Sequence, residues 1–370
     1  DGLEALGALA TALVALREEA LRIPKDASIP LFEAIGGGLV RMQLASPDFP
    51  RLKTAAGMFF ASASHRPGDD FQKELGALVE AWPESAPYVA RYRAKGYPPI
   101  SHSDAYRAAY RPAYRVVLAK FQRLIKVFQR IDALLQQQPS VLIAIDGRCG
   151  SGKSSLAALI SSVYGAMVLH MDDFFQTEAQ KAAGEAAAVA NIDGARLRSA
   201  LVPLKEGIPF EIRPYNCLTG EFLPPRHVSS ARVRVVEGSY CLHPSIALDY
   251  DLKIFVTVDA ETQRARIAVR NPTLYDRFIA EWIPNEESYI SAFRIAESCL
   301  QVNGLAQRLR RIGCRSAVVG VSGGLDSTLA LIVAARAFKM LQLPLDGLAA
   351  VTMPCFGTTR RTYENALKLA

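Results

Sequence analysis

The sequence has 370 residues, of which 50% are hydrophobic and 21% are charged, with a formal net charge of +7. This composition is typical of a soluble globular protein, and the length predicts two or three domains with their own cores. The positive charge fits a protein that handles anionic ligands but does not establish nucleic-acid binding. Six cysteines without a CxxC pair or regular spacing argue against a disulfide or zinc framework. We therefore expect reduced thiols and a cytoplasmic location.

Residues 1–135 are predicted to form a mainly helical region, because apolar residues recur at three- and four-residue spacing between breaks such as "GGG" at 36–38. The first apolar run, from Ala5 to Leu16, is too short to cross a bilayer. It also lacks the basic leader and the small-residue cleavage site of a signal peptide. No membrane contact is expected, and no function is assigned to this region.

A segment within that region, residues 88–117, interleaves tyrosine with arginine. Two sets recur at four-residue spacing: Tyr106, Tyr110 and Tyr114, and Arg107, Arg111 and Arg115. On a helix these sets would form two adjacent stripes, with Ser103 as a candidate N-cap and Pro112 bending or breaking the helix. Such a surface could bind single-stranded nucleic acid by stacking and phosphate contacts. We favour the alternative, a helix that packs its tyrosines on the neighbouring domain and leaves its arginines in water.

From about residue 140, short β-branched runs such as "VLIAID" and "LKIFVTVD" alternate with helical segments. This alternation is typical of a parallel sheet built from βαβ units, and the continuous apolar runs suit strands buried on both faces. We therefore predict an α/β domain over residues 136–299. A further strand–helix–strand pattern follows over 300–370, where "LQVNGLAQRLRRIG" is expected to be a helix and "AVVGV" and "GLAAVTMP" are expected to be strands.

Residues 147–154 match the pattern GxxxxGK[ST] and lie between the predicted strand "VLIAID" and the predicted helix "SSLAALISSVY". The glycines let backbone N–H groups curl around phosphate oxygens, and the helix N-terminus faces the anion. Lys153 is expected to reach the β- and γ-phosphates, and the Ser154 hydroxyl is expected to ligate Mg²⁺. ATP and Mg²⁺ are therefore the predicted cofactors. The cofactor-binding residues predicted in this P-loop are Gly147, Gly150, Ser151, Gly152, Lys153, Ser154 and Ser155.

Cys149 lies within the same loop. A thiol there could have a lowered pKa and act as a redox-sensitive group. We favour the alternative that it is a small side chain tolerated by the loop.

Charged residues at the ends of later elements are candidates for catalysis. The predicted strand before "DDFF" places Asp172 and Asp173 at its carboxyl end, where ligands bind in open α/β sheets. One carboxylate there is a candidate base for the acceptor hydroxyl, with capping of the next helix as the alternative for Asp172. Glu237 ends the run "VRVVE" and is a candidate to hold Mg²⁺ or its waters, with a plain strand-end turn as the alternative. Arg266 and Arg270 share one helix face and are candidates for a lid over ATP or for a solvated basic face.

Residues 141–299 resemble the uridine kinase and phosphoribulokinase group of P-loop kinases. The segments that carry the resemblance are "GRCGSGKSS", "HMDDFF", "NIDGARLRSALVPLKEG", "RPYNCLTG", "VEGSYCLHP" and "DLKIFVTVDAETQRARIAVRN". The resemblance implies ATP-dependent phosphorylation of a hydroxyl on a nucleoside or sugar-like molecule. By position it implies these roles: Asp172 as the base, Asp193, Arg213 and Tyr215 in acceptor binding, Glu237 as the second acidic residue, and Arg266 as the lid arginine.

Three segments depart from the pattern of this group. "RPYN" has Asn216 where uridine kinases usually have Asp, and the lid segment "RNPTLYDRF" lacks the usual charged pattern. The segment "EWIPNEESYI" is more typical of uncharacterised uridine-kinase-like proteins than of proven uridine kinases. The resemblance therefore indicates the class of reaction and leaves the acceptor open.

A second glycine-rich loop, "SGGLDS", follows the predicted strand "AVVGV" and opens a predicted helix. Its N–H groups and hydroxyls suit a pyrophosphate, and it has no lysine of the Walker type. The nucleotide-binding residues predicted here are Ser322, Gly323, Gly324, Asp326 and Ser327. The loop resembles the PP-loop of ATP pyrophosphatases, and residues 300–370 resemble the start of the synthetase domain of glutamine-dependent NAD synthase.

The second resemblance implies ATP-dependent amide formation on deamido-NAD, with release of AMP and pyrophosphate. "MPCFGTTRRTYENA" resembles a later segment of the same family, with Thr358 and Arg361 as candidate ligand contacts. The nitrilase-like glutaminase domain and most of the synthetase domain do not accompany it. We therefore expect a partial domain rather than a second working site, with completion by another chain as the alternative.

These observations predict three parts: a mainly helical region (1–135), a P-loop kinase domain with flanking helices (136–299), and a partial PP-loop unit of the adenine nucleotide α-hydrolase kind (300–370). The predicted function is phosphoryl transfer from ATP to a nucleoside or sugar-like acceptor. One alternative is a truncated NAD synthase that acts on deamido-NAD. The other is a non-catalytic ATP-binding or nucleic-acid-associated module. The favoured partner is a small molecule, without membrane or nucleic acid, and the oligomeric state is left open.

Overall fold

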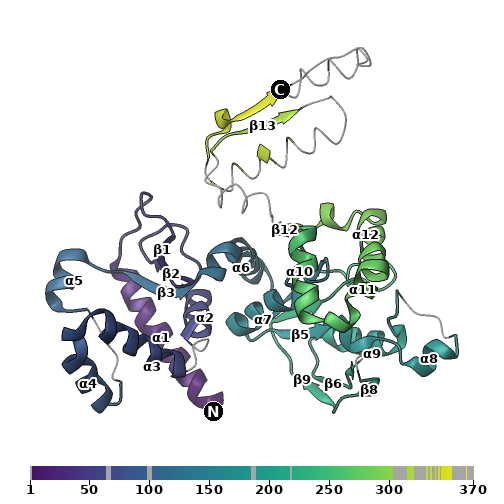
Figure 1. Ribbon diagram of the computed structural model, residues 1–370, viewed down its shortest axis with the longest axis horizontal. Coiled ribbons are helices and arrows are strands. Elements are labelled where there is room, and N and C mark those ends of the chain that lie inside the picture. The colour runs from purple at the N-terminus through teal and green to yellow at the C-terminus, as the bar shows by residue number, and fades with distance from the viewer. Residues whose placement is uncertain are drawn as a thin grey trace. The chain divides into compact units, whose positions relative to one another are not determined.

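The computed structural model describes residues 2–63, 68–97, 102–184, 189–216, 219–302, 315–320, 331, 334–335, 338, 341, 343–351 and 364. The chain divides into two compact units, Asp1–Ala144 with Ser154–Leu252, and Ile145–Lys153 with Lys253–Ala370. Strand β4 (Val141–Gly147) passes from the first unit into the second and contributes residues to both. Figure 1 labels many of the elements of both units.

The N-terminal part of the first unit combines helices with a small antiparallel sheet. Its helices are α1 (Gly2–Arg22), α2 (Leu52–Ala63), α3 (Gly68–Ala81), α4 (Ala86–Ala94), α5 (Asp104–Tyr110) and α6 (Ala119–Gln137). Its strands are β1 (Phe32–Gly36), β2 (Leu39–Gln43) and β3 (Tyr114–Leu118), in the order β1-β2-β3. The region is mainly helical as predicted, but the sequence analysis missed the sheet. Each strand has five residues, too few for the alternation of buried Val40 and Met42 in β2 to stand out from helical spacing.

The segment of interleaved tyrosine and arginine is not one helix. α5 begins after the predicted N-cap, where Ser103 Oγ accepts a hydrogen bond from Tyr106 N at 3.2 Å, and it ends before Pro112. Tyr114 lies in strand β3, so the two predicted stripes do not form. Tyr110 is 71% exposed, and the expectation that the tyrosines pack on a neighbouring domain is wrong for this residue.

A buried polar cluster holds α2 and α6 against helix α7 (Lys153–Tyr164). Thr54 Oγ1 donates to Asp132 Oδ1 at 2.6 Å, and Tyr164 OH donates to the same oxygen at 3.1 Å. Burial raises the pKa of the Asp132 carboxyl, and the two hydroxyl donors oppose that rise. The cluster ties the N-terminal region to the helix that follows the P-loop.

Close packing of α2 against α7 predicts opposite effects of two glycine substitutions. A Cβ atom at Gly57 would lie 2.6 Å from the backbone oxygen of Val163, whereas one at Gly76 in α3 would meet nothing within 4 Å. Gly57→Ala is expected to lower the free energy of unfolding by about 1–3 kcal/mol through overpacking, and Gly76→Ala to raise it by up to about 1 kcal/mol through helix propensity. Urea unfolding measures both changes, and equal effects would contradict the close approach.

The central sheet is parallel and has the strand order β12-β11-β4-β10-β5. Beside β4, its strands are β5 (Met167–His170), β10 (Val233–Glu237), β11 (Leu252–Val256) and β12 (Leu300–Val302). In the first unit β5 pairs in parallel with β10, and in the second unit β11 pairs in parallel with β12. Every residue of β4 and β10 is buried, as expected of parallel strands covered on both faces. The predicted α/β fold with a parallel sheet is confirmed.

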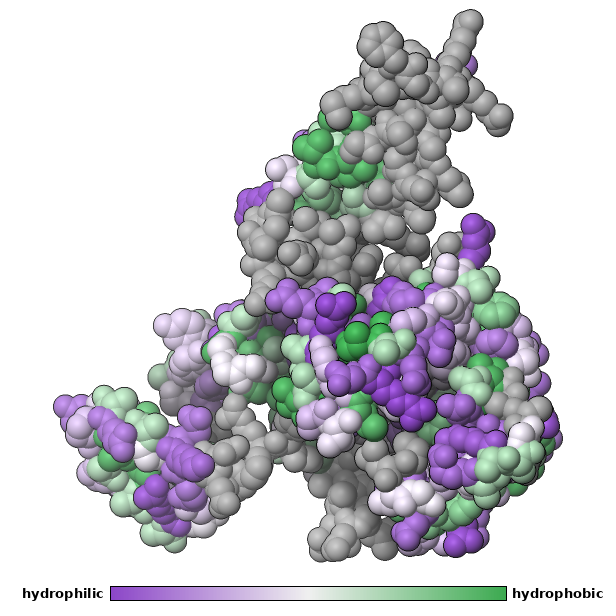
Figure 2. Space-filling model, turned by 45° about the vertical axis from the view of Figure 1, so that its right-hand side comes forward, coloured by the Kyte–Doolittle hydropathy of each residue, from purple (hydrophilic) through white to green (hydrophobic). Residues whose placement is uncertain are grey.

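Further helices and two short strand pairs complete this α/β part. The helices are α8 (Glu178–Ala182), α9 (Gly194–Glu206), α10 (Ala260–Arg270), α11 (Tyr275–Arg277) and α12 (Ile283–Ala292). The antiparallel pairs are β6 (Phe210–Ile212) with β9 (Arg226–Val228), and β7 (Tyr215–Asn216) with β8 (Glu221–Phe222). Among the residues described, no helix is both long enough and apolar enough to cross a membrane. On the face drawn in Figure 2, the coloured residues mix hydrophilic with hydrophobic side chains.

The C-terminal segment enters the central sheet before it forms strands of its own. Leu300–Val302, predicted as the start of a helix, instead form β12. The two later predicted strands are confirmed where they are described, since β13 (Ala317–Gly320) pairs in parallel with β14 (Leu348–Val351). Phe338 is buried and packs with Ala317 and Leu348 of these strands.

Candidate active site

The P-loop joins β4 to α7 and curls back on itself. Its backbone has positive φ angles at Gly147 (+136°), Gly150 (+70°) and Gly152 (+101°), conformations that L side chains rarely adopt. α7 begins at Lys153, whose Nζ donates to Gly147 O at 2.8 Å and to Arg148 O at 3.2 Å. The loop has the order of strand, turn and helix that the sequence predicts.

The loop and the start of α7 fit a phosphate and its metal ion. Ser154 and Ser155 lie in the first turn of the helix, where backbone N–H groups lack intrahelical partners and can face an anion. Ser151 Oγ is buried without a hydrogen-bond partner among the described residues, and a phosphate oxygen would supply one. The Ser154 hydroxyl is a hard oxygen donor of the kind that Mg²⁺ takes together with phosphate oxygens.

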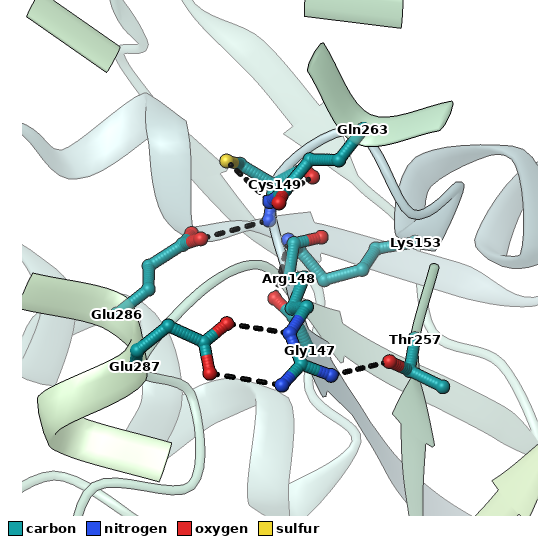
Figure 3. A network of polar contacts seen from close by, with 8 residues as sticks. All are labelled: Gly147, Arg148, Cys149, Lys153, Thr257, Gln263, Glu286 and Glu287. Atoms are coloured by element: carbon teal, nitrogen blue, oxygen red, sulfur yellow. Dashed lines mark hydrogen bonds and ion pairs between the residues drawn. The ribbon is translucent and has the colours of Figure 1, made fainter. Parts of the chain in front are cut away.

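Side chains from α10 and α12 hold the P-loop in place (Figure 3). Glu286 Oε2 accepts a hydrogen bond from Cys149 N at 2.9 Å, and Gln263 Nε2 donates to Cys149 O at 3.0 Å. Both carboxylate oxygens of Glu287 pair with the guanidinium of Arg148, at 2.5 and 2.8 Å. These partners were not predicted from the sequence. Glu286 and Glu287 lie within "EWIPNEESYI", which stood out only as a departure from the kinase pattern.

The surroundings of Cys149 argue against a reactive thiol. The side chain is buried, and Gln263 Nε2 lies 3.2 Å from its sulfur. Burial, followed by the negative charge of Glu286, raises the pKa of Cys149 to about 12, so the thiol stays protonated at neutral pH. The structure favours the interpretation of Cys149 as a small side chain tolerated by the loop.

The lid candidate Arg266 contacts the P-loop. From α10, its Nη1 donates to Gly150 O at 2.9 Å. The side chains of Arg266 and Arg270 are both exposed, as expected of one helix face. The guanidinium of Arg266 thus lies at the loop, and its closure over ATP stays a prediction.

In the first unit, a second group of polar side chains lies where β5 and β10 end. His170 and Glu237 are the last residues of these paired strands, and their Nδ1 and Oε1 atoms lie 2.5 Å apart. Glu237 is buried, and its hydrogen bond raises the pKa of His170 against the opposing effect of burial. Glu237 was predicted to hold Mg²⁺, whereas no role was predicted for His170, although this residue begins the segment "HMDDFF".

The two aspartates after β5 differ in their surroundings. Both lie in the 3-10 turn η2 (Met171–Phe174), so Asp172 does not cap an α-helix, which was the alternative role considered for it. Asp173 Oδ2 accepts a hydrogen bond from Arg226 Nη2 at 2.8 Å. Burial raises the pKa of Asp173, and the charge of Arg226 opposes that rise. Asp172 is exposed, which suits a carboxylate that must meet an acceptor from solution.

The three residues predicted to bind the acceptor each have a packing role. Asp193 is the N-cap of α9, where its Oδ1 accepts hydrogen bonds from two backbone amides at 3.0 and 3.1 Å. Tyr215 is buried, with its ring centre 5.3 Å from that of Phe222 in an edge-on arrangement. The guanidinium of Arg213 lies 5.3 Å from the centre of the same Phe222 ring. Contact of these three side chains with an acceptor stays a prediction.

Arg196 links these segments, and the sequence analysis did not single it out. Its Nη2 donates to Asp173 O at 2.9 Å and to Arg213 O at 2.7 Å. Its guanidinium also lies 4.8 Å from the centre of the Phe222 ring. The arginine therefore joins the turn that carries the aspartates to the β7–β8 hairpin.

The described residues contain no group of three or more His, Cys, Asp and Glu side chains that could hold a metal ion. Mg²⁺ commonly binds proteins through one or two oxygen ligands together with substrate phosphates. Ser154 and Glu237 stay the proposed protein ligands on that basis.

The residues predicted in the second loop lie outside the described part of the chain. They are Ser322, Gly323, Gly324, Asp326 and Ser327, and the same holds for Thr358 and Arg361. The strands β13 and β14, which precede and follow Ser322–Ser327 in the sequence, are described.

Comparison with known families agrees with both sequence resemblances. The model of the phosphoribulokinase/uridine kinase family matches residues 142–273, and the model of NAD synthase matches residues 298–370. The chain therefore contains one segment similar to the phosphoribulokinase/uridine kinase family, followed by one segment similar to NAD synthase.

Curated relatives that match about a fifth of the chain are glutamine-dependent NAD(+) synthetases. The glutamine-dependent NAD(+) synthetase of Mycobacterium leprae is 48% identical over 81 residues, which are 20% of this chain and 12% of that protein. The Mycobacterium bovis protein of the same name is 45% identical over 82 residues, which are 21% of this chain and 12% of that protein. The chain thus spans about an eighth of the length of these curated relatives.

Two solved structures with kinase titles are similar to about half of the chain. A possible uridine kinase from Bacillus stearothermophilus has 17% identity and a TM-score of 0.37, over 48% of this chain and 100% of that one. A putative fructose transport system kinase from Silicibacter sp. TM1040 has 22% identity and a TM-score of 0.37, over 47% of this chain and 93% of that one.

Proposed function

We propose that residues 136–299 transfer the γ-phosphoryl group of ATP to a hydroxyl of a nucleoside or sugar-like small molecule. The P-loop carries this proposal: three glycines with positive φ lead from a buried strand to a helix that begins with Lys153. The match of residues 142–273 to a kinase family supports the same chemistry.

The proposed roles follow from charge and exposure. Lys153 and the N–H groups at the start of α7 bind the phosphates, and Ser154 with Glu237 holds Mg²⁺, which neutralises developing charge when bound. Asp172, which is exposed just after the end of β5, accepts the proton of the acceptor hydroxyl. Arg266 extends the positive charge at the loop.

Product analysis across nucleosides and pentose phosphates, with ATP and Mg²⁺, tests this function. ADP should form with one acceptor class and should disappear in Lys153→Ala. Lys205→Ala, which changes an exposed lysine on α9, is the matched control and should keep full activity. ADP formation that persists in Lys153→Ala would contradict the proposal.

The NAD synthase segment supports a second candidate, because its identity of 48% to a glutamine-dependent NAD(+) synthetase extends over the whole matched region. A reaction with deamido-NAD, ammonia and ATP tests it in the same assay. AMP and pyrophosphate would support this ligase activity, whereas ADP alone would support the kinase.

A further inference from the structure

Helix α12 contacts the P-loop and the end of β4 through three side chains. Glu286 binds Cys149 N and Glu287 binds Arg148, as described above. In addition, Tyr289 OH donates to Asp146 Oδ2 at 2.7 Å. We call Glu286, Glu287 and Tyr289 the α12 clasp.

The clasp holds the half of the loop that precedes the phosphate-binding helix. Its contacts reach positions 146, 148 and 149, whereas α7 begins at Lys153. Asp146 connects Tyr289 to the start of the loop, because its Oδ1 accepts a hydrogen bond from Gly147 N at 2.7 Å. The peptide groups around Cys149 are held at both ends, at the N–H by Glu286 and at the carbonyl by Gln263. The clasp therefore fixes backbone groups of a loop whose glycines would otherwise allow many conformations.

Two of the three clasp residues, Glu286 and Tyr289, are buried. Glu286 and Tyr289 are 5% and 6% exposed, and their partner Asp146 is 1% exposed. A carboxylate removed from water costs free energy unless hydrogen bonds and cations compensate it. Glu286 receives this compensation from the P-loop itself, and Glu287 neutralises the adjacent Arg148. The buried carboxylate of Glu286 therefore depends on the loop conformation that it holds.

We propose that the α12 clasp preorganises the P-loop for ATP, with Glu286 as a positioning residue and Tyr289 and Glu287 in support. The proposal rests on the proposed kinase function for the identity of its ligand. The clasp acts through the loop backbone and reduces the conformational entropy lost on nucleotide binding. Its loss should therefore raise the Kd and the KM for ATP and leave the KM for the acceptor unchanged.

Titration of the full chain with ATP and Mg²⁺, without acceptor, tests the proposal. Glu286→Leu leaves the buried N–H of Cys149 without its acceptor and is expected to raise the Kd about 10–100-fold. Glu286→Gln keeps an amide oxygen in reach of that N–H and is expected to restore the Kd to within about threefold of the wild-type value. Glu281→Gln is the matched control, because Glu281 pairs only with solvent-exposed Arg277 among the ion pairs described, and it should leave the Kd unchanged.

Tyr289→Phe removes only the hydroxyl bound to Asp146 and provides a second test if Glu286→Leu does not fold. It is expected to raise the Kd about 3–10-fold. Thermal unfolding confirms that each variant is folded before titration. An unchanged Kd in folded Glu286→Leu or Tyr289→Phe would overturn the clasp. Wild-type protein that binds ATP but forms no ADP with any acceptor would overturn the kinase function instead, and the variant Kd values would still decide the clasp.

Discussion

Asp172→Asn is expected to lower kcat about 10²–10⁴-fold, the usual contribution of a general base, with a much smaller change in the KM for ATP. The reason is that the neighbouring carboxylates of Asp172 and Asp173 differ in their exposure to solvent. Asp173 accepts a hydrogen bond from Arg226 at 2.8 Å, whereas Asp172 is exposed at the carboxyl end of β5. The amide of Asn keeps the size of the side chain but cannot accept the proton of the acceptor hydroxyl.

Asp173→Asn is the matched control, because it makes the same chemical change one residue away. It should weaken the pairing with Arg226 and affect acceptor binding or stability more than kcat. Steady-state kinetics with the acceptor found by product analysis, together with ATP titration, measure the two variants. A larger loss of kcat in Asp173→Asn than in Asp172→Asn would assign the base to Asp173.

The P-loop could be predicted from sequence because its determinants are local. The pattern of residues 147–154, the apolar run before it and the helix after it all lie within about 25 residues. Glycine at positive φ, a lysine at the helix start and two serines in its first turn follow directly from that pattern. The same locality explains why the N-cap at Ser103 and the end of α5 before Pro112 were predicted.

The α12 clasp could not be predicted, since Glu286 and Tyr289 lie 137 and 143 positions from the residues they bind. No local spacing encodes such a contact, which exists only after β4, α10 and α12 have packed.

Asp193 shows that a residue found from a motif can still have an ambiguous role. Its place in a family motif implies acceptor binding, yet its carboxylate caps α9, and one sequence position is compatible with both roles.

Strand β12 lies at the junction between the two segments that match different families. The NAD synthase match begins at residue 298, and Leu300–Val302 pair in parallel with β11. β11 in turn ends at Val256, whose backbone oxygen packs against Gly147 of the P-loop. The first residues of the segment that matches NAD synthase therefore extend the sheet on which the P-loop is built, and the junction lies inside a folded unit rather than in a linker.

That packing predicts that Gly147→Ala is strongly destabilising. A Cβ atom at Gly147 would lie 2.0 Å from Val256 O and 2.8 Å from the backbone N and C of the same residue. The substitution would also force alanine to a φ of +136°. Backbone strain and overpacking each cost about 1–3 kcal/mol, so the free energy of unfolding should fall by roughly 2–6 kcal/mol.

Gly152→Ala separates these two contributions. Its φ is +101°, but a Cβ atom there would meet nothing within 4 Å, so only the strain of about 1–3 kcal/mol should appear. Urea unfolding of the two variants therefore measures how tightly β11 closes on the loop. Equal losses would mean that β11 yields to the added methyl group. A larger loss for Gly147→Ala would show that the strand next to β12 fixes the start of the P-loop, so that a change in β12 pairing is transmitted to the loop through the backbone of Val256.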